Sequence, residues 1–157
     1  MSNDAPQLFL TRVFNAPREL VYRAFTDPEQ VAAWWGPTGS VRPIDEMDFD
    51  VRPGGHQRFV QLFPHDPTVR AEVRIDLIDA AKDRVLHGVM RLQGNLPGDF
   101  GSFETRFRFE FYDEPGDCTR LEVRQWLPPD LSGATGEGWH QSFASLDDHL
   151  ATVARQG

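Results

Sequence analysis

The sequence contains very little cysteine and no long apolar run. Its one cysteine, Cys118, excludes an intramolecular disulfide framework and is typical of a reducing compartment. No segment is apolar over enough residues to cross a bilayer, and residues 1–6 lack the basic and apolar regions of a secretory signal. We therefore predict a cytoplasmic protein with no membrane partner.

Positive charge is also scarce. The 157 residues include 16 Lys and Arg against 24 Asp and Glu, which gives a net charge of −8, and Lys82 is the single lysine. Nucleic acids and anionic membranes favour a basic surface, so neither is expected as the main partner. A hydrophobic content of 39% over this length predicts a single domain, residues 1–157, with a substantial core.

Metal-binding and cofactor-binding patterns are absent as well. The five histidines show none of the close spacings that zinc sites use, and the acidic residues between 45 and 50 alternate with apolar ones instead of forming a calcium loop. Gly54-Gly55 reads as a hairpin turn with no helix after it, so a phosphate cradle is not expected. We predict neither a metal nor a cofactor.

Helical patterns occur only near the two ends of the chain. Pro17 can open a helix that carries Leu20, Val21, Ala24 and Phe25 on one face. A second short helix begins at Asp27-Pro28 and ends at the tryptophan pair, because Gly36-Pro37 stops it. A last helix is expected over residues 135–154, with one apolar stripe of four side chains. These are Trp139, Phe143, Leu146 and Leu150.

The middle of the chain reads as a series of strands joined by tight turns. The clearest alternation places Phe103, Thr105, Phe107, Phe109 and Phe111 on one face and charged residues on the other. Short strands linked by hairpins imply an antiparallel sheet with one buried face. The charged outer face is expected to serve solubility and strand register.

The most informative short stretch is Trp34-Trp35-Gly36-Pro37. Successive helical residues point about 100° apart, so one indole is expected in the core and the other elsewhere. Either both rings belong to the scaffold, or one of them forms part of a cavity mouth.

Several segments, taken in order, resemble the activator-of-heat-shock-protein-90-ATPase homologue group of the START-like (SRPBCC) superfamily. They extend over residues 8–152 and are weak singly but specific as an ordered set. The segments are 14–21, 26–29, Trp34-Trp35-Gly36-Pro37, 46–48, Arg52-Pro53-Gly54-Gly55, 119–121 and Glu137-Gly138-Trp139.

The resemblance implies an α+β helix-grip (Bet v-like) fold. In this fold a curved antiparallel sheet of about seven strands surrounds a long C-terminal helix, and two short helices follow the first strand. The superfamily includes lipid and polyketide binders, cyclases and hormone receptors that enclose an apolar cavity. This chain has Gln57 where relatives commonly carry an aromatic residue, which implies a more polar cavity.

An apolar lining with a few polar groups is how small-ligand sites are built, so we place the candidate site on the inner face of the sheet and the facing helix. Its buried amides must bond each other, water or a ligand. The candidate residues are Trp35, Met47, Gln57, Phe59, Gln61, His87, Val89, Thr105, Phe107, Gln125, Trp139, Ser142 and Phe143.

Three functions stay open. The first is a small hydrophobic or aromatic ligand-binding protein. The second is a cyclase, dehydratase or hydrolase in which His87 or a cavity glutamine polarises a carbonyl, although His87 could instead be a hydrogen-bonded core histidine. The third, implied by the family alone, is regulation of a heat-shock-protein-90 ATPase. No catalytic residue is assigned, and a homodimer is possible.

Overall fold

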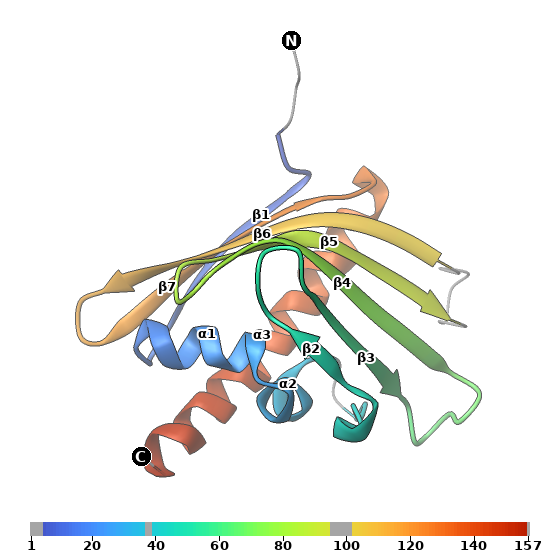
Figure 1. Cartoon of the computed structure of the whole chain (residues 1–157), viewed down its shortest axis with the longest axis horizontal. Helices are drawn as coiled ribbons and strands as arrows, with labels where there is room; N and C mark the ends of the chain where they lie inside the picture. The colour runs from blue at the N-terminus through green and yellow to red at the C-terminus, as the bar shows by residue number, and fades with distance from the viewer. Residues whose placement is uncertain (1–4, 37–38, 95–101, 157) are drawn as a thin grey trace.

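The computed structural model describes residues 5–36, 39–94 and 102–156, and they form a sheet with helices on one side (Figure 1). The loop predicted over residues 93–102 lies mostly outside the described residues. The strands are β1 (Leu8–Phe14), β2 (Asp48–Asp50), β3 (His56–Leu62), β4 (Arg70–Ala81), β5 (Val85–Gly94), β6 (Ser102–Glu114) and β7 (Cys118–Trp126). The helices are α1 (Arg18–Thr26), α2 (Pro28–Trp34) and α3 (Ser132–Gln156), with short 3-10 turns η1 (Ile44–Glu46) and η2 (Pro129–Leu131).

All seven strands belong to one antiparallel sheet in the order β1-β7-β6-β5-β4-β3-β2. Figure 1 shows this sheet curving over α3, with α1 and α2 on the same side. The prediction of an α+β helix-grip fold is confirmed. We call the face toward α3 the inner face and the opposite face the outer face.

The two short helices follow their sequence signals. Asp27 caps α2 by accepting a hydrogen bond from the backbone N–H of Glu29 at 3.1 Å, and Pro28 is the first helical residue. The Trp34 indole donates to the carbonyl oxygen of Ala24 at 2.8 Å, which ties α2 to α1. This bond satisfies the only polar atom of a side chain that is otherwise fully buried.

Helix α3 supplies the apolar stripe that packs into the curve of the sheet. All four stripe residues are buried, and the rings of Trp139 and Phe143 stack with centroids 5.3 Å apart. The helix begins at Ser132, three residues before the predicted start, because it continues through Gly133. No helix in the described part of the chain has the combination of length and apolar character that crossing a membrane requires.

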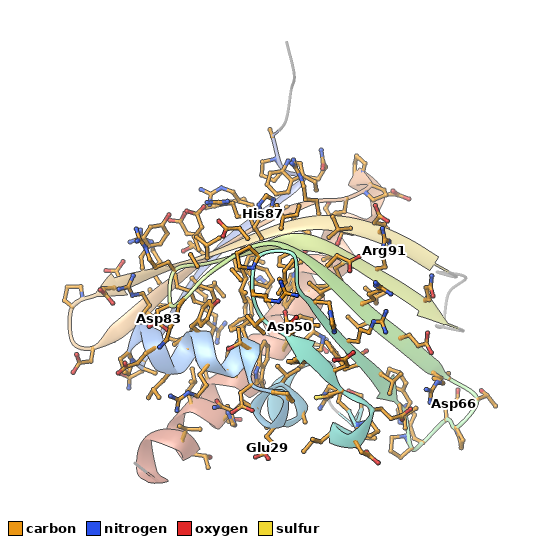
Figure 2. All side chains as sticks on the ribbon, in the orientation of Figure 1. Glu29, Asp50, Asp66, Asp83, His87 and Arg91 are labelled. Atoms are coloured by element: carbon orange, nitrogen blue, oxygen red, sulfur yellow. The ribbon has the colours of Figure 1, made fainter. Side chains whose placement is uncertain are left out.

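Strand β5 faces the opposite way from our prediction. We expected Val85, His87 and Val89 to point inward, but the buried inner residues are Leu86 and Met90. Both faces of β5 carry apolar side chains, so alternation alone fits either register. A register shift in β4 between Leu77 and Asp79 also interrupts the pairing with β5. Figure 2 places His87 on the outer face, away from α3.

Both rings of the tryptophan pair are buried in one core cluster with centroids 5.4 Å apart, so the expectation that one indole lies away from the core is wrong. Helix α2 ends at Trp34, and Trp35 has extended backbone angles, so the two indoles are not constrained to helical spacing. Trp34 packs on Phe25 in the core. Trp35 contacts Phe59 and Trp139 edge-on, with ring centroids 5.4 and 5.2 Å away.

Candidate functional site

A pocket of about 250 Å³ lies between the inner face of the sheet and the first half of α3. Its wall is mostly apolar and aromatic, with a few amide and hydroxyl groups. The lining residues are Trp35, Gly36, Gln61, Val73, Met90, Leu92, Gln125, Thr135, Gly138, Trp139, Gln141 and Ser142. None of them carries an ionisable side chain, so the wall formed by the described residues is neutral.

A chain of hydrogen bonds fixes one wall of the pocket. The Trp139 indole donates to Oε1 of Gln125 at 2.9 Å, and Nε2 of Gln125 donates to the hydroxyl of Thr105 at 2.9 Å. All three side chains are buried. Because each buried polar group here has a partner, the Trp139 ring is held in one orientation above the sheet.

The Gln61 amide is a polar group of the pocket wall that takes no part in this network. Its side chain lines the pocket and is only 7% exposed, and no hydrogen bond joins it to another side chain or backbone group of the described residues. Gly36 makes room for it, since a Cβ on Gly36 would lie 2.8 Å from Nε2 of Gln61. The hydroxyl of Ser142 accepts from the N–H of Gly36 at 3.3 Å, which leaves its own proton to donate.

The remaining candidates are distributed outside the pocket. Gln57 is buried as predicted, but its amide donates to the carbonyl oxygen of Phe25 at 2.8 Å and so holds α1 to the sheet. Met47 is half-buried at the edge of the core. The other candidates off the pocket are the core rings Phe59, Phe107 and Phe143, the bridging Thr105, and the outer-face residues His87 and Val89.

Five of our predicted site residues therefore line one pocket, namely Trp35, Gln61, Gln125, Trp139 and Ser142. We missed Met90 and Leu92 because β5 was assigned the wrong face. Thr135, Gly138 and Gln141 flank Trp139 and Ser142 on α3, and their one-turn spacing was a usable signal.

Two histidines with altered pKa values lie off the pocket wall. Burial lowers the pKa of His149, partly opposed by the Asp27 carboxylate, and its Nε2 lies 3.1 Å from Oε1 of Gln30. Burial also lowers the pKa of His87, helped by Arg108 and Arg106 on the outer face. Among the described residues, no group of three His, Cys, Asp or Glu side chains is placed to hold a metal ion.

The curved sheet, the long C-terminal helix and the pocket between them define a helix-grip protein of the START-like class. Residues 15–151 match the family described as Activator of Hsp90 ATPase homolog 1-like protein. The chain belongs to this family, which confirms the resemblance drawn from the sequence. No protein with a curated description matches it significantly.

Solved structures repeat the same fold at low sequence identity. A protein of Chromobacterium violaceum is 23% identical with a TM-score of 0.73, over 90% of this chain and 94% of its own. An AHSA1 protein of Silicibacter pomeroyi is also 23% identical, with a TM-score of 0.74 over 92% and 97%. A protein of Staphylococcus epidermidis is 15% identical with a TM-score of 0.75 over 97% and 93%. At these identities the likeness concerns the fold alone.

Proposed function

We propose that this protein binds a small aromatic or apolar molecule in the pocket between the sheet and α3, in the cytoplasm. The observation that carries the proposal is the unpartnered Gln61 amide in a wall of tryptophan, valine and methionine. The amide atoms are not fully buried, so solvent reaches them through the pocket, and a ligand with one polar group would replace that solvent with a direct hydrogen bond. The apolar wall would supply most of the affinity.

The pocket volume limits the size of the ligand. About 250 Å³ falls below the range of roughly 300–1,000 Å³ that drug-sized ligands take. One or two fused rings, or a short acyl chain, fit this volume better than a long fatty acid. The ligand we propose is thus a compact ring compound carrying an amide, carbonyl or hydroxyl group.

The neutral wall favours binding over catalysis by proton transfer. General acid–base catalysis needs a titratable group within hydrogen-bond reach of the substrate. The one histidine that we considered for that role, His87, lies on the outer face of the sheet. An enzyme using this pocket would have to polarise a carbonyl through neutral donors, such as the Gln61 amide and the Ser142 hydroxyl.

Titration followed by tryptophan fluorescence tests the proposal, because Trp35 and Trp139 both line the pocket. The ligand panel consists of phenols, indoles, small aromatic amides and straight-chain acids of increasing length. We expect saturable quenching by compact ring compounds and a declining response as the acids lengthen. Gln61→Leu should weaken binding of ligands with a polar group about tenfold and leave purely apolar ligands unchanged.

Gln93→Leu is the matched control, because Gln93 is an exposed amide on the outer face of β5. It should bind the neutral ligands of the panel as the wild type does. The absence of any saturable response across the panel would contradict the proposal. Equal affinities of Gln61→Leu and the wild type for the polar ligands would also contradict it.

A further inference from the structure

The outer face of the sheet carries an unusual row of arginines. In the strand register, Arg58 on β3 lies opposite Arg74 on β4, and Arg74 lies opposite Arg91 on β5. Like charges directly opposite each other on neighbouring strands destabilise a sheet. In this register, acidic residues occur only at the two ends of the row. Asp48 on β2 lies opposite Arg58, and Glu104 on β6 lies opposite Arg91.

The carboxylates nearby do not neutralise the row evenly. Asp76 contacts both Arg74 and Arg91, with N–O distances of 3.3 and 2.9 Å. Glu104 adds a second contact to Arg91 at 2.6 Å. Arg58 has no ion pair or hydrogen bond with any other described residue, so its guanidinium retains all of its donors.

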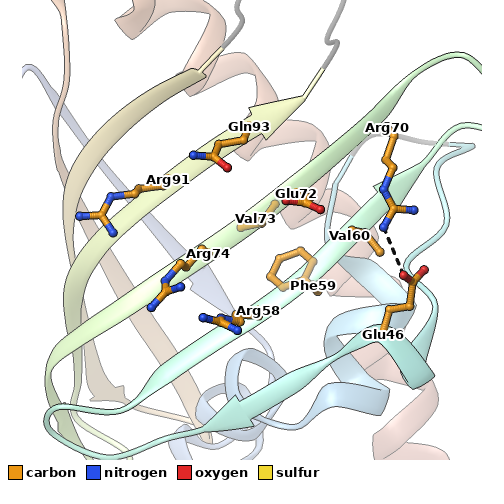
Figure 3. Close-up of a pocket in the computed structure, with 10 residues that line it drawn as sticks. All are labelled: Glu46, Arg58, Phe59, Val60, Arg70, Glu72, Val73, Arg74, Arg91 and Gln93. Carbon is orange, nitrogen blue, oxygen red and sulfur yellow. Dashed lines mark hydrogen bonds and ion pairs between the residues drawn. The ribbon is translucent and has the colours of Figure 1, made fainter.

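These arginines line a groove of about 650 Å³ (Figure 3). Arg70 adds a fourth guanidinium and pairs with Glu46 at 3.2 Å, and the Glu72 carboxylate lies in the same groove. The four arginines and two glutamates of the wall carry a net charge of +2, on a chain whose net charge is −8. Asp76 and Glu104, which contact Arg74 and Arg91, bring this total to zero, and the guanidinium that has no ion pair among the described residues is that of Arg58.

A guanidinium presents a planar fork of donors that matches the oxygen atoms of phosphate and carboxylate groups. A polyanion seated across the row would offset the repulsion between neighbouring arginines and occupy the donors of Arg58. The volume lies within the range that small metabolites fill. We infer that this outer groove is a second binding site, for a small molecule that carries two or more phosphate or carboxylate groups.

This site is separate from the pocket under α3, because the sheet lies between them. Arg58 points outward while its neighbours Gln57 and Phe59 are buried toward the helix side. The inference thus does not rest on the function proposed for the inner pocket. A protein that binds nothing in one site could still bind its ligand in the other.

Calorimetry and backbone amide chemical shifts test the inference on the whole chain, with inorganic pyrophosphate and citrate as separate probes. We expect saturable one-to-one binding of at least one probe, with shifts confined to β3, β4 and β5. Preference for pyrophosphate would identify phosphate groups as the ligand chemistry, and preference for citrate would identify carboxylates. Because binding is electrostatic, the affinity should fall as salt is added.

Arg58→Gln should weaken binding about tenfold or more, since it removes the guanidinium with all its donors available. Arg23→Gln is the matched control: it removes the same charge from an exposed position on α1 and should bind like the wild type. Glu72→Gln should tighten binding, because it removes a carboxylate from the groove.

Thermal unfolding without ligand separates lost binding from lost structure. Arg58→Gln should unfold at the wild-type temperature or above it, because one like-charge contact has been removed. The inference is overturned if neither probe binds saturably, or if Arg58→Gln and Arg23→Gln lose the same affinity.

Discussion

Nε1 of Trp139 on α3 lies 2.9 Å from Oε1 of Gln125 on β7, and this bond joins the helix to the sheet beside the pocket. Both side chains are buried, and Gln125 is also bonded to Thr105 on β6. The pocket wall thus depends on a polar contact inside an apolar core. Such a contact sets orientation more than it adds net stability.

Breaking this contact from one side should destabilise the fold. In Gln125→Met the indole N–H of Trp139 and the hydroxyl of Thr105 lose a buried partner, at a cost of about 1–3 kcal/mol each. Urea unfolding measures the loss. The double variant Gln125→Met with Trp139→Phe should recover part of it, because the orphaned indole N–H is then absent. Simple additivity of the two single effects would contradict this explanation.

Alanine substitutions at Gly36 and Gly39 distinguish the effect of steric crowding from that of backbone strain. Both have positive φ angles, +92° and +89°, so alanine at either position costs about 1–2 kcal/mol of backbone strain. A Cβ on Gly36 would also lie 2.8 Å from Nε2 of Gln61, whereas a Cβ on Gly39 would meet nothing within 4 Å. We expect Gly36→Ala to be less stable than Gly39→Ala in chemical denaturation. Only the former should disturb ligand binding in the pocket.

Gly138 offers a way to close the pocket without unfolding the protein. It lines the pocket, and a Cβ built on it meets no atom within 4 Å. Gly138→Leu should therefore reduce ligand affinity while α3 becomes more stable by about 0.5–1 kcal/mol. Gly133→Leu is the matched control, since Gly133 is also helical and open but does not line the pocket. Fluorescence titration and thermal unfolding of both variants check this expectation, and equal affinities would contradict it.

The folded protein should lose stability as the pH falls from about 7 toward 5. Burial lowers the pKa of His149 below its unfolded value of about 6.5, so below that pH the unfolded chain binds a proton more readily than the folded one. The contribution is complete above pH 6.5 and is lost as the pH drops through the folded pKa. The lowered pKa of His87 acts in the same direction.

Urea unfolding at several pH values measures this loss. His149→Gln should flatten the dependence in part, with the contribution of His87 remaining. His140→Gln, which removes an exposed histidine from the same helix, serves as the control. An unchanged pH dependence in His149→Gln would show that His149 does not carry the effect.

Much of the fold was predictable because its local signals agree with one another. The Asp27-Pro28 cap, the four-residue stripe of α3 and the phenylalanine alternation of β6 each specify one element and one face. Strand β5 has no such asymmetry, since Val85 and Val89 on one face are as apolar as Leu86 and Met90 on the other. We predicted the wrong face for His87 because the two faces of β5 are similarly apolar and because the pairing of β4 with β5 is irregular.

The candidate site was predictable only in part, because its composition depends on which side chains use their hydrogen bonds elsewhere. Gln57 and Gln61 are both buried glutamines on β3, four residues apart and therefore on the same face of the strand. The carbonyl of Phe25 engages Gln57, and nothing in the sequence marks that contact across 32 positions. The arginine row was not predicted because strand register decides which charges face each other.

The two ends of helix α3 differ in local stability. Its first seven residues include Gly133, Gly136 and Gly138, and each costs about 1 kcal/mol of helix propensity relative to alanine. The second half is anchored by the buried Leu146 and Leu150. The turns beside the pocket should therefore open and exchange their amide hydrogens with solvent far faster than the turns around Leu146. A molecule could enter through this end while the rest of α3 keeps the fold intact.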